Sequence, residues 1–137
     1  MLRLENIEWT TPTGEKILQG IDLTFPDNKL VVITGPNGGG KTTTAKIIAG
    51  LEKPQSGKIF LDDEDITNLD ITERAKKGIS FAFQQPVRFK GITVRDIISM
   101  ASSEPLSETE ISALLHKVGL CAKDYLDREI NAALSGG

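Results

Sequence analysis

The sequence predicts an α/β fold in which a parallel sheet, a glycine-rich turn and a helix follow one another. Three observations lead to this fold class. Strand-like alternation occupies the start of the chain, a short apolar run covers residues 30–34, and a glycine-rich turn over residues 35–42 separates that run from a helical pattern. A continuous apolar run is typical of a strand buried on both faces of a parallel sheet.

The first 25 residues predict two strands that pair with each other. Leucine or isoleucine at positions 2, 4 and 7 is separated by polar residues, and a second alternating run covers residues 17–25. Thr11-Pro12-Thr13-Gly14 lies between the two runs and has the composition of a turn. We therefore expect the second strand to pair back on the first.

Four further elements are expected between residues 41 and 83. A helix over 41–49 stops at Gly50, a strand covers 57–61, a helix covers 71–77 and a strand covers 79–83. Asp70 and Glu73 have the spacing of a capping box at the start of the second helix, and Gly78 marks its end.

The last third of the chain predicts helices. One is expected over residues 93–101. Ser107 and Glu110 form a second capping-box pattern. The helix that they open has one apolar face, made of Ile111, Leu114, Leu115 and Val118.

Composition excludes several classes of function. The net charge is −3, from 16 Lys and Arg against 19 Asp and Glu, so no nucleic-acid partner is expected. One cysteine, Cys121, and one histidine, His116, are too few for a zinc site. We expect Cys121 to be a buried packing thiol and His116 to be packed or solvated on its helix. No apolar run approaches the roughly 20 residues of a membrane span, which makes a cytoplasmic location the default expectation.

The glycine-rich turn gives the strongest functional signal. Residues Gly35 to Thr42 fit the phosphate-loop pattern G-x-x-x-x-G-K-[ST], with a strand expected before them and a helix after them. Glycines let backbone N–H groups wrap around phosphates, and the helix N-terminus adds partial positive charge. The alternative is a turn that merely connects a strand to a helix, and the two flanking patterns argue against it.

The pattern assigns roles to individual residues. Lys41 is expected to reach the β- and γ-phosphates of ATP, and Thr42 to give its hydroxyl to Mg²⁺. The full set of expected nucleotide-binding residues in this loop is Gly35, Pro36, Asn37, Gly38, Gly39, Gly40, Lys41, Thr42 and Thr43.

Further segments make the chain similar to one family. The phosphate loop looks like a Walker A motif, Phe83-Gln84 looks like a Q-loop, and Leu134-Ser135-Gly136-Gly137 looks like the start of a signature motif. In this order the segments resemble the ATP-binding cassette (ABC) ATPases, from Met1 to Gly137. The resemblance implies a P-loop NTPase core with an antiparallel β subdomain over residues 1–92, a helical subdomain over 93–134 and the start of the signature over 134–137.

The resemblance also implies an activity, ATP hydrolysis that drives conformational work. Gln84 would touch Mg²⁺ and the attacking water, so Lys41 and Gln84 are the expected catalytic residues. Two such subunits would sandwich two ATP molecules head to tail. Ser135 and the amides of Gly136 and Gly137 would then contact the nucleotide held by the partner.

Two branches of the family stay open. Residues 82–87 with Gly91, and Arg128-Glu129-Ile130-Asn131, are similar to the ATPase subunit of Suf-type iron–sulfur cluster assembly. That likeness favours the assembly branch, with a scaffold protein as partner. The alternative is the ATP-binding subunit of a membrane transporter, associated with the membrane through a permease. In either branch the partner is expected to dock near Pro86–Met100.

The sequence departs from the family pattern in two places. Thr11, Pro12 and Thr13 stand where an aromatic usually stacks on adenine, and Trp9 is the nearest candidate. The sequence also ends at Gly137, before the Walker B strand. We therefore expect an N-terminal portion of a longer ATPase, which by itself binds ATP weakly and turns it over negligibly. The acidic residues 62–65 are expected to be a solvated turn.

Overall fold

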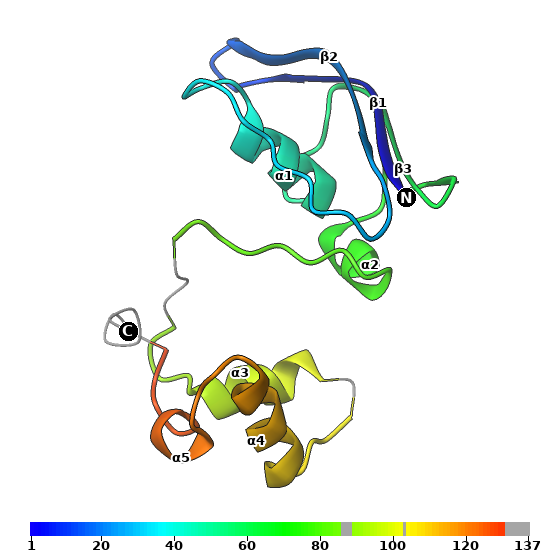
Figure 1. Cartoon of the computed structure of the whole chain (residues 1–137). Coiled ribbons are helices and arrows are strands. Elements are labelled where there is room, and N and C mark those ends of the chain that lie inside the picture. Colours follow the sequence, from blue (N-terminus) through cyan, green and yellow to red (C-terminus); the bar gives the residue numbers. More distant parts are fainter. Residues whose placement is uncertain (86–88, 103, 131–137) are drawn as a thin grey trace. The chain divides into compact units, whose positions relative to one another are not determined.

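The computed structural model describes residues 1–85, 89–102 and 104–130. The chain divides into two compact units, Met1–Ala82 and Phe83–Gly137 (Figure 1). Each unit has a hydrophobic core of its own. The boundary after residue 92, expected between the subdomains, stays a prediction. No helix in the described part of the chain is long and apolar enough to cross a membrane.

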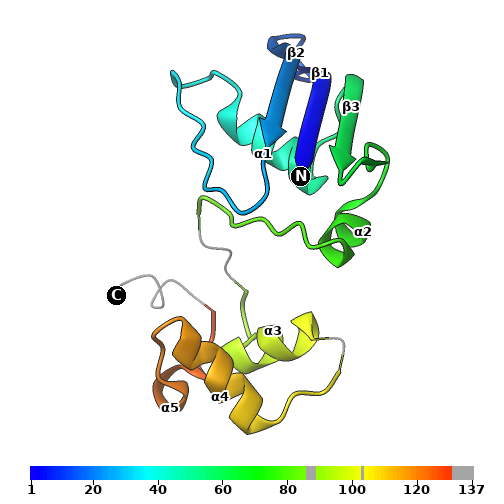
Figure 2. The same ribbon diagram turned by 45° about the vertical axis from the view of Figure 1, so that its right-hand side comes forward.

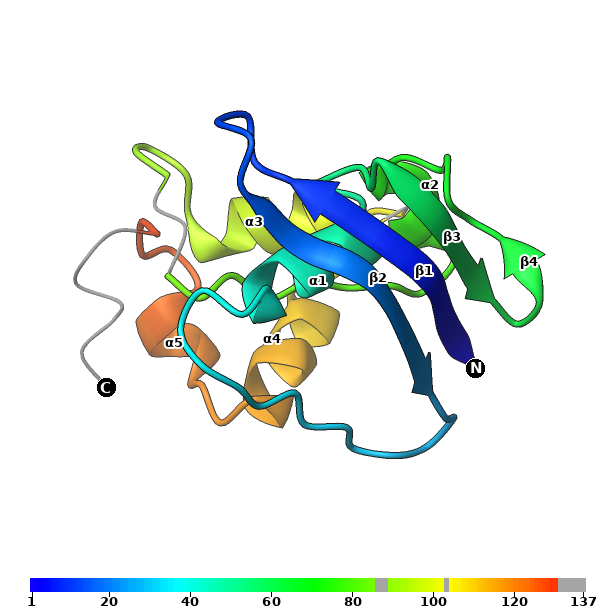
Figure 3. The ribbon, with the colours of Figure 1, turned by 90° about the horizontal axis from the view of Figure 1, so that it is seen from above.

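The first unit contains an antiparallel sheet. Its strands are β1 (Leu2–Thr10), β2 (Lys16–Phe25), β3 (Ser56–Leu61) and the short β4 (Glu64–Asp65), in the order β2-β1-β3-β4 (Figures 2 and 3). Leu4 of β1 lies opposite Leu23 of β2 and Ile59 of β3. The paired strands and the turn predicted near the start of the chain are confirmed. Asp62 and Asp63 form the turn before β4, both with positive φ.

A single helix, α1 (Lys41–Ala49), covers one face of this sheet (Figure 2). Its Ile47 is fully buried, and the core that it joins consists of Leu4, Ile7, Leu18, Ile47, Ile59 and Ile66. The helix ends at Gly50, whose φ of 82° allows the left-handed conformation that closes a helix. These bounds match the predicted helix.

The second helix of this unit, α2 (Ile71–Lys76), begins with the predicted capping box. The Asp70 carboxylate accepts from the amide of Glu73, and the Glu73 carboxylate accepts from the amide of Asp70, both at 2.8 Å. The helix ends one residue earlier than predicted. The amide of Ile79 donates to the carbonyl of Arg74 at 3.1 Å, which ties the exit of α2 back onto the helix.

Two predicted strands are absent from the described residues. Residues 30–34 form no strand, and Leu30 and Val32 are 93% and 72% exposed. Residues 79–83 likewise have no regular secondary structure. A parallel strand takes its hydrogen bonds and its cover from neighbours distant in the sequence. The sheet of the described residues contains no strand from residues 30–34, so the burial predicted for that run does not occur.

The second unit is helical. Its helices are α3 (Val94–Ala101), α4 (Glu108–Lys117) and α5 (Ala122–Tyr125), of which the sequence predicted the first two. Ile111 and Leu115 of α4 form its core with Leu126. Leu114 and Val118 were predicted on the same face, yet they are 42% and 69% exposed. The apolar face of α4 is thus narrower than predicted, because only the residues four apart, 111 and 115, face the core.

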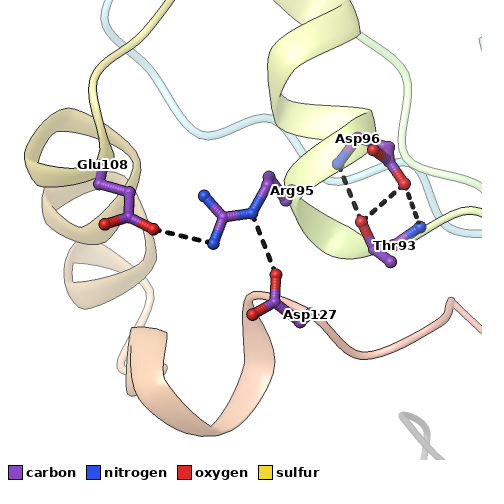
Figure 4. Close-up of polar contacts among 5 residues, drawn as sticks. All are labelled: Thr93, Arg95, Asp96, Glu108 and Asp127. Atoms are coloured by element: carbon purple, nitrogen blue, oxygen red, sulfur yellow. Dashed lines mark hydrogen bonds and ion pairs between the residues drawn. The ribbon is translucent and has the colours of Figure 1, made fainter.

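The chain after α5 returns to the start of α3. Thr93 bridges Glu129 in antiparallel fashion, and the amide of Arg95 donates to the carbonyl of Leu126 at 2.9 Å. The Arg95 guanidinium reaches the carboxylates of Asp127 and Glu108, both at 3.0 Å (Figure 4). The side chains of Asp127 and Glu108 are largely exposed, so the ion pairs contribute little beyond orientation. The backbone pairing therefore holds the returning segment.

Two capping boxes order the helical unit. Thr93 accepts from the amide of Asp96 at the start of α3 (Figure 4), and Ser107 accepts from the amide of Glu110 at the start of α4. The hydrogen bond from the Thr93 hydroxyl, helped by its amide, lowers the pKa of Asp96. The hydroxyl and amide of Ser107 lower the pKa of Glu110 in the same way. Each box is therefore stronger when its carboxylate is ionised.

The lowered pKa values predict a loss of stability in acid. A carboxyl whose folded pKa is below its unfolded value, about 4, stabilises the fold above that pH and ceases to do so as the pH falls through the folded pKa. Ser107→Ala should lower the free energy of unfolding by about 1 kcal/mol at pH 7. The difference from wild type should shrink at pH 3, where the box is already weakened.

Urea denaturation followed by circular dichroism at pH 7 and pH 3 measures both effects. Ser112→Ala, a change in the interior of the same helix, is the matched control. An equal loss at the two pH values would show that the Ser107–Glu110 box does not titrate.

Candidate functional site

The glycine-rich loop has a backbone that only glycine adopts easily. Gly38 and Gly40 both have a φ of 81°, in the left-handed region, and Gly35 has a φ of 152°. The amide of Gly39 donates to the carbonyl of Pro36 at 3.1 Å, which closes a tight turn inside the loop. A side chain at these positions would strain the backbone and crowd the surface that a phosphate must approach.

Lys41 curls back over the loop that precedes it. Its ammonium donates to the carbonyls of Gly35 and Pro36, at 2.8 and 2.7 Å. An ammonium has three N–H donors, so two are engaged by the loop itself. The side chain is thereby held over the loop, and a phosphate that enters would compete with two neutral carbonyls for the positive charge.

The N-terminus of α1 is electrostatically open to an anion. Gly40 is the N-cap, so no side-chain oxygen caps the helix, and the first turn contains no acidic residue. Thr44 is buried, and its hydroxyl donates to the carbonyl of Gly40 at 2.9 Å. Helix N-termini carry partial positive charge and backbone N–H groups, which together favour phosphate.

The loop is fixed to the sheet at its last glycine. Gly40 is buried, and a Cβ placed there would lie 2.4 Å from Cδ2 of Leu18 and 3.3 Å from Cγ2 of Ile17. Leu18 is itself in the core of the first unit. Gly40 is therefore required both for its dihedrals and for this close approach to β2, which the sequence pattern alone did not show.

The metal ligand expected on this loop is accessible. Thr42 is exposed on the first turn of α1, and Thr43 beside it is half-buried. Among residues 1–85, 89–102 and 104–130, no group of three His, Cys, Asp or Glu side chains could hold a metal ion. The exposed hydroxyl of Thr42 is an oxygen donor of the kind that Mg²⁺ prefers.

The other predicted site residues lie in the second unit or outside the described residues. Gln84 lies on an exposed bend at the start of the second unit. Ser135, Gly136 and Gly137 lie outside the described residues. Of the docking segment Pro86–Met100, residues 86–88 also lie outside them, and Phe89 and Met100 are exposed. The roles of these residues remain predictions.

Three secondary expectations can be compared with the structure. Trp9 lies in β1 opposite Leu18 and packs against the sheet core, which favours a packing role. His116 is exposed on α4, one of the two predicted outcomes. Cys121 was predicted to be buried and is exposed, because it lies before the four-residue α5 rather than inside the helical core.

One buried charge escaped the sequence reasoning. Arg74 of α2 is 1% exposed and bonds to carbonyls at the end of α1. In the sequence it stands among Glu73, Lys76 and Lys77, as a solvated helix residue would, and nothing in one sequence distinguishes it.

Comparison with known proteins supports the interpretation of the loop. The ABC transporter family profile matches residues 18–137. An uncharacterized ABC transporter ATP-binding protein of Methanocaldococcus jannaschii is 39% identical over 132 residues, which are 90% of this chain and 53% of that protein. The energy-coupling factor transporter ATP-binding protein EcfA2 of Clostridium acetobutylicum is 35% identical, over 99% of this chain and 51% of that protein.

A solved structure supports the fold. A dimeric ATP-binding cassette in a post-hydrolysis state, bound to ADP and Pi, superposes with a TM-score of 0.75 at 28% identity, covering 94% of this chain and 61% of that one. The expected cassette fold is thereby confirmed. The chain spans about half the length of the curated relatives that it matches.

The close approach of Gly40 predicts the effect of adding a methyl group. Gly40→Ala should lower the free energy of unfolding by about 1 kcal/mol, because alanine strains the left-handed backbone. It should lower it by about a further 1–3 kcal/mol, because the added Cβ displaces Leu18 from a packed core. Gly38→Ala is the matched control, since it has the same φ of 81° and nothing within 4 Å of its added Cβ. It should cost only the backbone strain.

Trp9 is the only tryptophan and lies in the first unit, so its fluorescence during urea denaturation reports this difference. Equal losses in the two variants would mean that Leu18 gives way without cost.

Proposed function

This chain belongs to the ABC transporter ATPase family, and on that basis we propose that it binds the phosphates of ATP at Gly35–Thr42. The single observation that carries the proposal is the arrangement around Lys41. An ammonium, a left-handed glycine loop and an uncapped helix N-terminus converge on one small surface. Each of the three favours a multiply charged anion.

In the bound state the contacts of Lys41 would change. Its ammonium would leave the carbonyls of Gly35 and Pro36 for phosphate oxygens, because a positive charge attracts a negative charge more strongly than a neutral carbonyl dipole. The backbone amides of the loop, with those of Thr42 and Thr43, would hold the remaining oxygens. The Thr42 hydroxyl would take one position around Mg²⁺, and the metal would neutralise part of the phosphate charge.

The chain spans about half the length of its curated relatives, and ATP hydrolysis is proposed as the activity of a protein of that full length. The reaction depends on positioning and on electrostatic stabilisation more than on covalent chemistry. In it Gln84 would orient the attacking water and Mg²⁺. A head-to-tail dimer is proposed because the similar cassette of known structure is dimeric. Ser135, Gly136 and Gly137 would then bind the nucleotide of the partner subunit.

For the biological role we favour the ATP-binding subunit of a membrane transporter. The relatives compared above are named as transporter ATP-binding proteins. A permease would dock near Pro86–Met100, where Phe89 and Met100 expose apolar surface. Iron–sulfur cluster assembly, with a soluble scaffold as partner, is the second candidate and rests on the likeness of residues 82–87 and 128–131.

Mg-ATP calorimetry tests the nucleotide site. Lys41→Ala should weaken binding by about tenfold or more, because it removes a charge-assisted contact to phosphate. Lys46→Ala, a lysine in the last turn of the same helix, should change the affinity by less than about twofold, because screening weakens distant surface charges. Equal effects of the two substitutions would contradict binding at this loop.

Cross-linking of the tagged protein in the cells that produce it separates the two biological roles. A polytopic membrane protein cross-linked to residues 89–100 would support transport. A soluble scaffold at the same position would replace that role with cluster assembly.

A further inference from the structure

Arg74 is a buried cation whose side chain binds backbone carbonyls. Its guanidinium donates to the carbonyls of Ile47 and Ile48, at 2.6 and 2.9 Å. It also donates to the carbonyls of Thr67 and Leu69, at 2.9 and 3.0 Å. Burial lowers the pKa of Arg74, yet a guanidinium stays protonated in proteins. The charge is therefore held in the interior by carbonyl dipoles.

The end of α1 supplies these dipoles. The last carbonyls of a helix have no partner within the helix and carry partial negative charge. Arg74 donates to two of these carbonyls, those of Ile47 and Ile48. The backbone at Gly50 leaves space for the Arg74 side chain. A Cβ at Gly50 would lie 3.2 Å from Cδ and Nε of Arg74, so the left-handed glycine after α1 leaves just enough room for the guanidinium stem.

The backbone of the same residue holds a third segment. The carbonyl of Arg74 accepts from the amides of Lys77 and Ile79, both at 3.1 Å. Ile79 begins the run that leads to Gln84. One residue thus joins the end of the phosphate-loop helix, the segment 67–69 and the exit of α2.

We propose that Arg74 is a positioning residue for the phosphate loop, because it clamps the far end of the helix whose first turn would hold the nucleotide. A nine-residue helix is about 13 Å long, so a tilt of about 10° at one end moves the other by about 2 Å. Binding groups need to be held within about 0.5 Å of their productive positions. This inference rests on the nucleotide binding proposed above.

The alternative is that Arg74 only stabilises the first unit. In that case its substitution would act like the loss of any core residue. Arg74→Lys is the informative variant. It keeps the positive charge, but a lysine ammonium lacks the planar guanidinium that donates to all four carbonyls at once. Leu4→Ala is the matched control. Leu4 is as buried as Arg74, at 1% exposure, and its side chain donates to no carbonyl of α1.

Two measurements on the 137-residue chain decide between these roles, at a temperature where Trp9 fluorescence shows each variant to be folded. Hydrogen exchange without nucleotide should rise in Arg74→Lys over residues 35–49, and not in Leu4→Ala beyond its general loss of stability. Mg-ATP calorimetry should show affinity about tenfold weaker in Arg74→Lys, as expected for a misplaced binding group. The affinity of Leu4→Ala should stay within about twofold, since a cavity in the core leaves the hydrogen bonds of Arg74 to the carbonyls of Ile47 and Ile48 in place.

Exchange over residues 35–49 that rises equally in both variants would overturn the positioning role. Unchanged affinity in Arg74→Lys, with wild-type binding intact, would overturn it as well. Failure of the wild-type chain to bind Mg-ATP would instead contradict the proposed function, and hydrogen exchange alone would then decide the role of Arg74.

Discussion

The contact between Gly40 and β2 is the constraint on which the phosphate loop depends. A left-handed residue without a side chain is the only way to bring the loop backbone against Leu18 and to start α1 immediately afterwards. The sheet thereby fixes the start of the helix, and Ile47 fixes its body in the same core. Lys41 follows Gly40 directly, so its backbone position is set by the packing of the sheet rather than by the loop alone.

The elements that the sequence predicted well are those with local causes. The bounds of α1 follow from glycines at either end, and the predicted capping boxes of α2 and α4 follow from side chains three residues apart. The turn near Thr11 and the paired strands around it are likewise short-range features. In each case the group that stabilises the element lies within a few residues of it, so one sequence contains the whole argument.

The predictions that failed depend on distant partners. The run over residues 30–34 has the composition of a buried parallel strand, but composition does not provide the neighbours that bury it. Cys121 was expected to be buried, but it is exposed although Leu120 and Ala122 on either side of it pack against the helical core. Arg74 was passed over because its acceptors, the carbonyls of Ile47 and Ile48, lie 27 and 26 residues away. The same reasoning explains why the phosphate loop was found readily and the roles of Gln84 and Ser135 rest on family likeness.

The exposure of residues 30–33 has a consequence for the behaviour of the chain in concentrated solution. Leu30, Val31, Val32 and Ile33 are between 40% and 93% exposed, and three of them are β-branched or strongly strand-forming without a charge among them. Such a segment is a template for intermolecular β-pairing. Asp27, Asn28 and Lys29 come directly before this segment. Charged and turn-forming residues in such positions oppose the addition of further strands. The solubility of the chain by itself should therefore depend on ionic strength, since salt screens the lysine that keeps neighbouring copies apart.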